Sequence, residues 1–290
     1  VIGIGDHVCD KYVHQKTMYP GGQALNFAVY ARMQGAQSAY LGVFGSDTVA
    51  HHVQNTLDQY QVDRSRCRQY EGANGCARVN LVDGDRVFLG SNKGGVLREH
   101  PIRLSDEDLA YIRQFDLCHT TNNSYMDDEL PRLRQAGIPI SYDFSGQWID
   151  NERVAKVAPY VDYAFLSCGS VALERAQDIC RFLHSQGAGM VIATRGSEGA
   201  VLFDGQDFYI RPPELVEAID TLGAGDSFAT AFLLSWRQSQ LDHGEDMTPD
   251  LRRSLLEQAL LKAAQFSAQT CLVYGAFGHG LAYDPAVDQD

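Results

Sequence analysis

Short apolar runs alternate with longer amphipathic segments along much of the chain. Runs typical of buried strands occupy 1–5, 115–120, 138–143, 161–167 and 190–194. Segments with the length and apolar spacing of helices lie at 22–35, 48–60, 105–114, 171–186 and 249–270. This alternation predicts an α/β fold with a doubly wound, mainly parallel sheet flanked by helices. The nearly continuous apolar run at 190–194 fits a strand that is covered on both faces.

The region around residue 80 follows a different pattern. Two strand-like runs, Cys76–Val82 and Asp85–Leu89, flank the dipeptide Asp83-Gly84, which is a strong hairpin signal. Because two strands are barely stable alone, the hairpin needs a partner. With the segment 11–18, it predicts a small separate sheet. We therefore expect a single domain over 1–290, with lid segments at about 11–18 and 75–92 inserted in it.

A glycine-containing turn precedes the apolar segment 229–236, which has the composition of a buried helix. The turn is Ile219-Asp220-Thr221-Leu222-Gly223-Ala224-Gly225-Asp226-Ser227-Phe228. The first N–H groups of a helix lack intrahelical partners, so Gly223, Ala224 and Gly225 are candidates to hold a phosphate. Asp226 is a candidate to accept a proton from the group that attacks that phosphate. Ordinary helix capping in a turn without a ligand is the alternative.

Three other groups of residues are candidates for binding. Asp6 and Asp10 follow the strand at 1–5, on the loop beyond its carboxyl end, where open α/β sheets bind ligands. An Asx turn is the alternative for both. Gly21-Gly22-Gln23-Ala24-Leu25-Asn26 opens a helix, in which Asn26 is either a ligand-binding or a satisfied polar residue. Thr194-Arg195-Gly196-Ser197-Glu198-Gly199 ends a strand and is either a ligand-binding loop or a plain turn.

These motifs and their order resemble the signatures of the ribokinase-like, or PfkB, carbohydrate kinases. The carboxy-terminal signature is Asp-Thr-x-Gly-Ala-Gly-Asp-Ser-Phe at 220–228, and the amino-terminal one combines Gly21 to Asn26 with the segment 40–47. The resemblance implies the ribokinase-like fold with a small β lid over the sugar, and ATP and Mg²⁺ as cofactors. Asp226 is then the catalytic base, with an anion hole made by Gly223, Ala224 and Gly225.

The same resemblance implies further site residues. The implied sugar contacts are Asp10, Asp6, Gly21, Gly22 and Asn26. The implied nucleotide contacts are Thr194, Gly196 and Gly199, with Arg195 adding charge beside the triphosphate. Asp220 and Thr221 are implied as candidate ligands of a monovalent cation such as K⁺. The region 274–276 is implied as a wall of the adenine pocket, and the lid as a homodimer contact.

Two departures from the family pattern indicate which branch of the family this chain resembles. Most members carry an Asn-x-x-Glu motif, whose Glu helps to organise the magnesium shell. This chain has Ser167-Cys168-Gly169-Ser170 in its place, with Glu174 as a weak substitute. A frequent Asp-x-Asn-x-Arg motif is here Asp143-Phe144-Ser145-Gly146-Gln147-Trp148. With Gly5-Asp6-x-x-x-Asp10 and Asp85-Arg86-Val87-Phe88, this motif resembles the fructoselysine 6-kinase branch.

The branch implies ATP-dependent phosphorylation of the 6-hydroxyl group of a fructosamine, a fructose carried on an amino acid's nitrogen. A kinase for another sugar or a nucleoside, of the fructose or ribose type, is one alternative. A sugar-binding regulator without catalysis is the other, although such a binder does not need Asp226 beside Gly-Ala-Gly.

Composition excludes several other classes of protein. The net charge of −13 over 290 residues argues against a nucleic-acid-binding surface and an anionic membrane patch. The apolar runs are too short for membrane spans, and the segment 1–5 favours a core strand over a signal peptide. Seven scattered cysteines without a Cys-x-x-Cys pair suggest neither a zinc site nor a disulfide framework. We expect a reduced, cytoplasmic enzyme with a small-molecule substrate.

Overall fold

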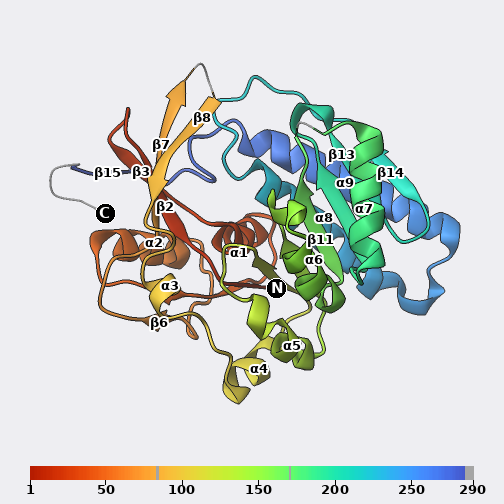
Figure 1. The fold of residues 1–290 in the computed structure, drawn as a ribbon, viewed down its shortest axis with the longest axis horizontal. Coiled ribbons are helices and arrows are strands. Elements are labelled where there is room, and N and C mark those ends of the chain that lie inside the picture. Colours follow the sequence, from red (N-terminus) through yellow and green to blue (C-terminus); the bar gives the residue numbers. More distant parts are fainter. Residues whose placement is uncertain (83–84, 170, 285–290) are drawn as a thin grey trace.

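The structure, a computed structural model, describes residues 1–82, 85–169 and 171–284. Its larger sheet consists of β1 (Ile2–Ile4), β4 (Ala39–Leu41), β9 (Cys118–Thr121), β10 (Ile140–Asp143), β11 (Tyr163–Ser167), β12 (Met190–Thr194), β13 (Ala200–Phe203) and β14 (Phe208–Arg211). The strand order is β14-β13-β12-β11-β10-β9-β1-β4 (Figure 1). The strands from β12 to β4 pair in parallel, and β13 and β14 extend the sheet antiparallel. The predicted α/β fold with a mainly parallel sheet is confirmed.

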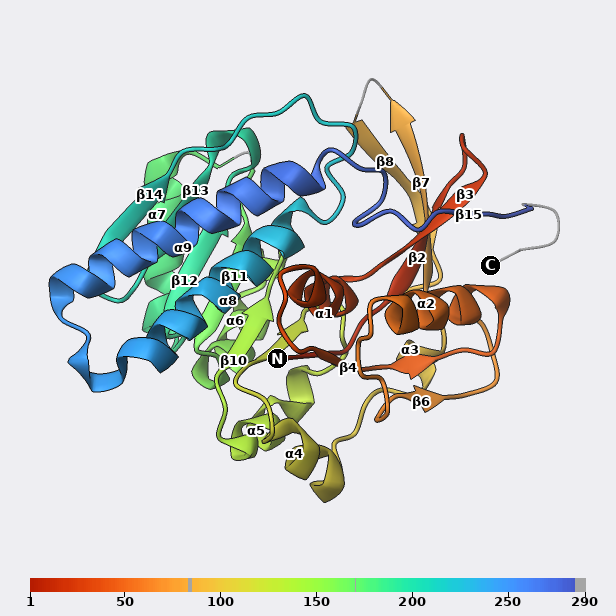
Figure 2. The same ribbon diagram turned by 180° about the vertical axis from the view of Figure 1, so that it is seen from behind.

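Helices cover both faces of this sheet. One face carries α1 (Gln23–Met33), α8 (Ala224–His243) and α9 (Pro249–Thr270), which lie in front in Figure 2. The opposite face carries α4 (Asp106–Ile112), α5 (Leu130–Leu133), α6 (Asn151–Val157) and α7 (Leu173–Ser185). Within the described ranges, none of the helices combines the length and hydrophobicity needed to cross a bilayer.

Other elements lie between these along the chain. They are α2 (Thr48–Gln59), α3 (Val96–Glu99), β5 (Val43–Phe44), β6 (Arg68–Gln69), η1 (Asp127–Glu129), η2 (Arg134–Ala136), η3 (Gln147–Ile149), η4 (Ala158–Tyr160), η5 (Gly196–Glu198) and η6 (Gly244–Asp246). The parallel pair β5 and β6 forms a separate small sheet.

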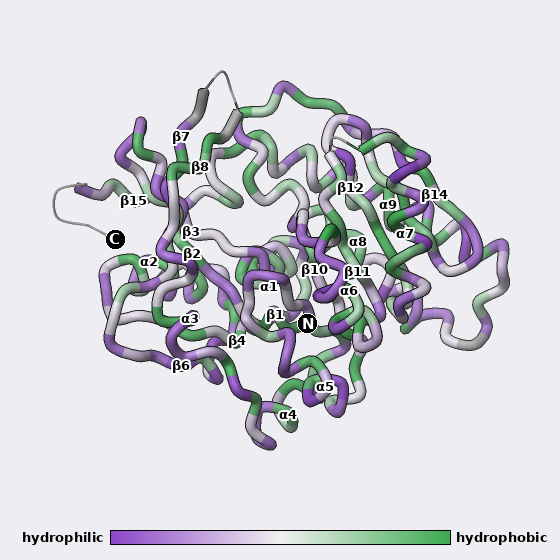
Figure 3. Tube along the Cα trace, viewed as in Figure 1, coloured by the Kyte–Doolittle hydropathy of each residue, from purple (hydrophilic) through white to green (hydrophobic). Residues whose placement is uncertain are grey.

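The central strands are apolar on both faces because each face packs against helices. In β11, Tyr163 and Phe165 belong to the core on the α8 and α9 side, whereas Ala164 and Leu166 belong to the core on the α7 side. Strand β12 divides its side chains in the same way. Both strands are largely hydrophobic in Figure 3. Successive side chains of these strands therefore pack on opposite faces of the sheet, into two different hydrophobic cores.

A second sheet stands beside the first, in the order β15-β3-β2-β7-β8. Its strands are β2 (Val8–Tyr12), β3 (Thr17–Gly21), β7 (Cys76–Val82), β8 (Asp85–Ser91) and β15 (Leu281–Ala282). The antiparallel pairing of β7 with β8 confirms the predicted hairpin, although its turn at Asp83 and Gly84 lies outside the described residues. Segment 11–18 contributes parts of two strands, which pair with each other.

The prediction that Asp10 lies on a loop is wrong. Asp10 lies within β2, where it pairs with Tyr19 on β3 and Ala77 on β7. Gly5, the residue after β1, has φ +131°, a conformation that L side chains rarely adopt, and the chain then enters the second sheet. Asp10 is therefore fixed in the middle of a strand and is buried.

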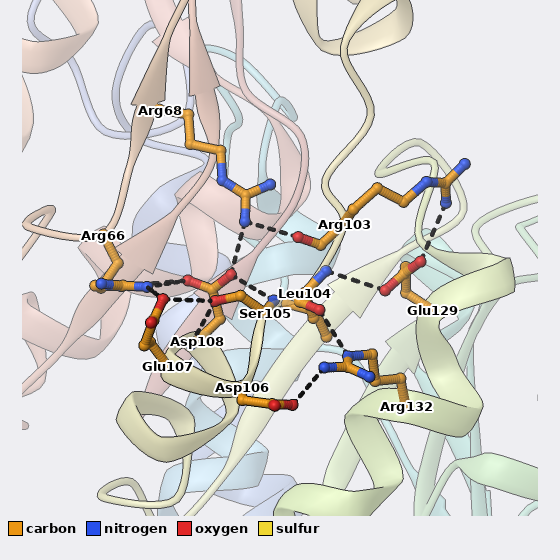
Figure 4. A network of polar contacts seen from close by, with 10 residues as sticks. All are labelled: Arg66, Arg68, Arg103, Leu104, Ser105, Asp106, Glu107, Asp108, Glu129 and Arg132. Carbon is orange, nitrogen blue, oxygen red and sulfur yellow. Dashed lines mark hydrogen bonds and ion pairs between the residues drawn. The ribbon is translucent and has the colours of Figure 1, made fainter.

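A polar network holds the segment before α4 in place (Figure 4). Asp108 on α4 is buried and accepts hydrogen bonds from Arg66 at 2.7 Å and Arg68 at 2.6 Å. Arg68 also donates to the carbonyl group of Arg103 at 2.8 Å, and the Arg103 guanidinium donates to Glu129 at 3.2 Å. The network thereby ties Arg103 to two neighbouring elements, β6 and η1.

Candidate active site

The amino terminus of α8 meets α1 at the centre of the molecule. Gly223 is the N-cap of α8, the helix begins at Ala224, and Asp226 lies in its first turn. From α1, Asn26 Nδ2 donates a hydrogen bond to Asp226 Oδ2 at 2.6 Å. The structure thus brings together one residue from each of the two family signatures. Asn26 Oδ1 is buried and has no hydrogen-bond partner among the described residues, so it can accept from a ligand.

A large cleft, here the first cleft, opens beside this pair. It has a volume of about 1250 Å³ and is lined by residues of the second sheet, of α1, α6 and the start of α8, and of the segments that follow β1, β9 and β10. Of the predicted sugar contacts, Asp6, Asp10, Gly22 and Asn26 line it, together with Asp226. Gly21 does not line it but lies in β3, where an added Cβ would be 2.6 Å from Asp10 Oδ2. Glycine at this position therefore leaves room for the Asp10 carboxylate.

Asp6 has a structural role in addition to its place in the cleft. The N-cap of α1 is a glycine without a side chain, and Asp6 accepts the N–H groups of Gln23 at 2.8 Å and Ala24 at 3.3 Å instead. Its Oδ1 also accepts the hydroxyl groups of Thr121 at 2.7 Å and Ser124 at 3.0 Å. Asp6 thus caps α1 from a distant part of the chain and connects it to β9.

We expect Asp6→Ala to lower the free energy of unfolding by about 2 kcal/mol, because α1 loses its cap and two buried hydroxyl groups lose an acceptor. Urea denaturation measures this change. Asp6→Asn preserves the size and one acceptor oxygen, so its effect should be smaller. Unchanged stability in Asp6→Ala, with a raised KM for the sugar alone, would show that Asp6 is only a substrate contact.

Asp143 is a buried carboxylate near Asp226 that the sequence motifs do not single out as a ligand and that lines neither cavity as the structure describes them. It ends β10 and is buried, and its Oδ1 accepts the N–H of Ser145 at 2.6 Å. Burial and then the nearby charge of Asp226 raise the pKa of Asp143 to about 7. The position of Asp143 at the carboxyl end of a parallel strand is the signal that could have identified it.

This raised pKa predicts a pH-dependent stability. The unfolded carboxyl group ionises near about pH 4, whereas the folded one remains protonated up to about 7, so Asp143 increasingly disfavours folding as the pH rises between these values. Asp143→Asn preserves the acceptor for Ser145 and cannot ionise. We expect it to raise the free energy of unfolding by about 2 kcal/mol more at about pH 8 than at about pH 5. Urea titrations at both pH values test this, and equal effects would contradict it.

A second pocket of about 270 Å³ lies on the other side of the α8 terminus. The predicted nucleotide contacts Thr194, Gly196 and Gly199 line it together with Ala224 and Gly225. An added Cβ at Gly196 or Gly225 would have no described atom within 4 Å, so a ligand can approach the backbone closely at both positions. The apolar part of the wall comes from Leu215, Val216, Ala264 and Ala268. The pocket thus combines an apolar wall with the first N–H groups of α8, which can hold an anion.

Other predicted nucleotide contacts lie elsewhere. The Arg195 guanidinium donates to the Val171 carbonyl at 3.1 Å and does not line the second pocket as the structure describes it. The segment 274–276 does not line that pocket either, because Gly275 packs against Tyr19 near the second sheet. Glu174 is exposed in the first turn of α7. Ser170, in the segment that replaces Asn-x-x-Glu, lies outside the described residues.

The predicted cation ligands are engaged within the protein. Asp220 is buried and accepts hydrogen bonds from the Tyr12 hydroxyl group and from the N–H groups of Leu222 at 3.0 Å and Gly275 at 2.9 Å. The Thr221 carbonyl accepts the N–H of Ala224 at 3.3 Å. Among the described residues, no group of three or more His, Cys, Asp or Glu side chains is placed to hold a metal ion. A monovalent cation at Asp220 and Thr221 stays a prediction.

The outer part of the first cleft was not predicted. It includes the residues Phe88, Lys93, Arg103, Asn122, Asn123, Tyr125, Asp127, Asp128, Gln147, Arg153 and Lys156. They come from β8, the segment 122–128, η3, α6 and the loops before α3 and α4, so no single motif in the sequence relates them. Charged residues just after predicted strands are the one available signal, and it applies to many surface residues as well.

Known proteins resemble this chain over most of its length. The family description "pfkB family carbohydrate kinase" matches residues 3–277. Fructosamine kinase FrlD of Bacillus subtilis is 40% identical over 284 residues, which cover 98% of this chain and 94% of that protein. Fructoselysine 6-kinase of Escherichia coli is 33% identical over 274 residues, which cover 94% of this chain and 98% of that protein.

Solved structures show the same fold. The ribokinase of Arabidopsis thaliana, complexed with ribose and ATP, matches with a TM-score of 0.77 and 18% identity over 96% of this chain and 94% of that chain. The ribokinase of Giardia lamblia matches with a TM-score of 0.79 and 14% identity over the same shares, 96% and 94%. The ribokinase-like fold is therefore confirmed. Because the family match and both kinase relatives span nearly the whole sequence, this chain belongs to the pfkB family of carbohydrate kinases, which are phosphotransferases with an alcohol group as acceptor.

Proposed function

We propose that this kinase transfers the γ-phosphoryl group of ATP to the 6-hydroxyl group of a fructosamine. The observation that carries the proposal is the position of the α8 terminus between two binding sites. Asp226 lines the first cleft, whereas Ala224 and Gly225 line the second pocket. The choice of a fructosamine is supported by the names of the two relatives, fructosamine kinase and fructoselysine 6-kinase.

In the proposed reaction, Asp226 accepts the proton of the sugar hydroxyl group while the hydroxyl oxygen attacks the γ-phosphorus. A bond forms between the sugar oxygen and the phosphorus. The bond between the phosphorus and the bridging oxygen breaks, and its electron pair leaves with ADP. Asn26 holds the Asp226 carboxylate in one orientation, and Asn26 Oδ1 is available to accept a sugar hydroxyl group.

The amino terminus of α8 would stabilise the negative charge of the transferring group. Its first N–H groups carry partial positive charge, and Gly225 has open space beside its Cα. Mg²⁺, when bound with ATP, would neutralise phosphate charge. The residues present fit an ion held mainly by phosphate oxygens and water, because the described residues offer no cluster of three or more acidic, His or Cys ligands.

A substrate panel tests the proposal. Purified protein with ATP and Mg²⁺ is assayed on fructoselysine, fructose-asparagine, fructose and ribose, and NMR identifies the phosphorylated position. We expect the highest kcat/KM on a fructosamine, with a 6-phosphate as product. Faster turnover of fructose or ribose would refute the substrate but not the kinase, whereas turnover of no sugar at all would refute the kinase mechanism.

Assembly and location are also proposals. We propose that β8, an edge strand of the second sheet, contacts a second copy of the chain, because Val87, Phe88 and Leu89 are 42%, 64% and 50% exposed on it. Light scattering would show a dimer, and a monomer at micromolar concentration would refute the contact. A reducing, ATP-containing cytoplasm suits the enzyme, since the buried Cys9, Cys118, Cys168 and Cys180 are free thiols.

A further inference from the structure

The rim of the first cleft carries more charge than a neutral sugar requires. Asp10 and Asn26 are buried at the floor, whereas Lys93 and Lys156 on the rim are accessible to solvent. The volume of about 1250 Å³ exceeds the range of roughly 300–1,000 Å³ that is usual for small-molecule sites. Four basic residues line the rim, namely Lys93, Arg103, Arg153 and Lys156, in a chain whose net charge is −13. These four cations outnumber Asp127 and Asp128, the two carboxylates in the same part of the cleft, which favours a ligand with a negatively charged part.

Three of the four cations are already paired with protein carboxylates. Arg153 Nε lies 3.1 Å from Asp127 Oδ2, and Lys156 Nζ lies 2.6 Å from Asp128 Oδ1. Arg103 Nη1 lies 3.2 Å from Glu129 Oε1. Lys93 forms no ion pair with any residue that the structure describes. It is therefore the rim cation whose charge is available to a ligand.

The backbone of Lys93 is held in a fixed position over the cleft. The Tyr125 hydroxyl group donates to the Lys93 carbonyl at 2.8 Å, which joins the end of the β7–β8 hairpin to the loop after β9. Asn92, next to it, donates to the Asn74 carbonyl at 2.6 Å. Lys93 and Tyr125 have φ values of +56° and +55°, a conformation that is costly for residues other than glycine. Such strain is typical of positions whose geometry serves binding.

An unsatisfied acceptor lies in the same cleft. Asn122 Oδ1 is buried and lacks a hydrogen-bond partner among the described residues. A buried acceptor of this kind is satisfied by a ligand that carries an N–H group. The floor therefore suits sugar hydroxyl groups, Asn122 suits an amine, and Lys93 suits a carboxylate. A sugar joined through nitrogen to an amino acid carries all three groups.

We propose that Lys93 binds the free carboxylate of the amino acid carried by the fructosamine. The enzyme then selects fructosamines of free amino acids over fructosamines of simple amines. This inference rests on the proposed function and adds the group that distinguishes one class of fructosamine from the other. It makes Lys93 a specificity-determining residue, remote from the transferred phosphoryl group.

The experiment compares fructoselysine with its decarboxylated analogue, in which a hydrogen atom replaces the carboxylate. For the wild type, we expect a KM about tenfold lower for fructoselysine. Lys93→Ala should raise the KM for fructoselysine about tenfold, leave kcat nearly unchanged and leave the KM for the analogue unchanged. Lys93→Glu should lower the KM for the cationic analogue and raise that for fructoselysine further. Equal effects on both substrates, or no effect on either, would overturn the proposal.

Lys16→Ala is the matched control. Lys16 is also exposed, lies in the turn between β2 and β3 and has φ +48°, but it does not line the cleft. We expect its kinetics to equal those of the wild type, and a KM change like that of Lys93→Ala would show a general charge effect and overturn the assignment. If the wild type turned over both fructosamines and the Lys93 substitutions left both KM values unchanged, this inference would be refuted but the proposed function would stand. Turnover of plain sugars but of neither fructosamine would instead refute the proposed function.

Discussion

We expect Asp226→Asn to lower kcat about 10³-fold while the KM for ATP stays close to the wild-type value. Asparagine has the size of aspartate, and its side-chain oxygen can still accept the hydrogen bond that Asn26 donates at 2.6 Å. It cannot take up the proton of the attacking hydroxyl group. Because Asp226 lines the first cleft rather than the second pocket, ATP binding should be preserved. Initial-rate kinetics with varied ATP and varied sugar measure both parameters.

The control for this prediction is Asp128→Asn. It makes the same chemical change in the same cleft, on a side chain that is 70% exposed and paired with Lys156. Exposed ion pairs contribute little, so kcat should change less than about threefold. If Asp226→Asn retained more than about a tenth of the wild-type kcat, Asp226 would not be the base, and the proposed mechanism would fail even if the substrate assignment held.

The main sheet was predictable because its strands and helices carry local, periodic patterns. The predicted strand at 190–194 and the predicted helix at 249–270 correspond to β12 and α9, with the same ends. Both elements bury apolar residues against a neighbouring layer, so the hydrophobic pattern contains most of the information needed to locate them. The strand expected from 115 instead begins at Cys118, because the turn after α4 continues into a bend at residues 115–116.

The second sheet was harder to predict because its pairing is not local. Strand β2 contains Asp10 and Lys11, both buried, and it pairs with β3 on one side and β7 on the other. Its burial depends on partners that the local pattern does not reveal. The positive φ of Gly5, which redirects the chain toward this sheet, is likewise a property of the folded backbone.

The candidate site likewise contains residues that the local sequence relates and residues that only the fold brings together. Asp226, Ala224 and Gly225 lie in one continuous motif, so a short stretch of sequence was sufficient to relate them. Lys93 and Asn122 lie on separate loops, and only the fold brings them to one cleft. The capping role of Asp6 was also missed, because its acceptor atoms serve a helix that begins many residues later. Motifs thus related the residues that are proposed to surround the transferred phosphoryl group, but not those that are proposed to select the rest of the substrate.

Two neighbouring glycines of the α8 terminus should respond in opposite ways to alanine. At Gly223, which has φ +76°, an added Cβ would be 2.9 Å from the Ala276 Cβ and would overlap the Tyr30 hydroxyl group. That hydroxyl group donates to the Ala276 carbonyl at 2.5 Å and is buried, so it has little room to move. We expect Gly223→Ala to lower the free energy of unfolding by about 3 kcal/mol, from backbone strain and overpacking. Displacement of the α8 terminus should also reduce kcat about 10²-fold.

Gly225→Ala is the comparison that separates packing from ligand binding. Gly225 lies inside α8, and an added Cβ would meet no described atom within 4 Å, so alanine should stabilise the helix by about 0.5–1 kcal/mol. The same Cβ would occupy space in the second pocket, where ATP is proposed to lie, and should raise the KM for ATP about tenfold. Urea denaturation and ATP kinetics on both variants measure these effects. A stabilised Gly225→Ala enzyme with an unchanged KM for ATP would contradict a nucleotide phosphate at this end of α8.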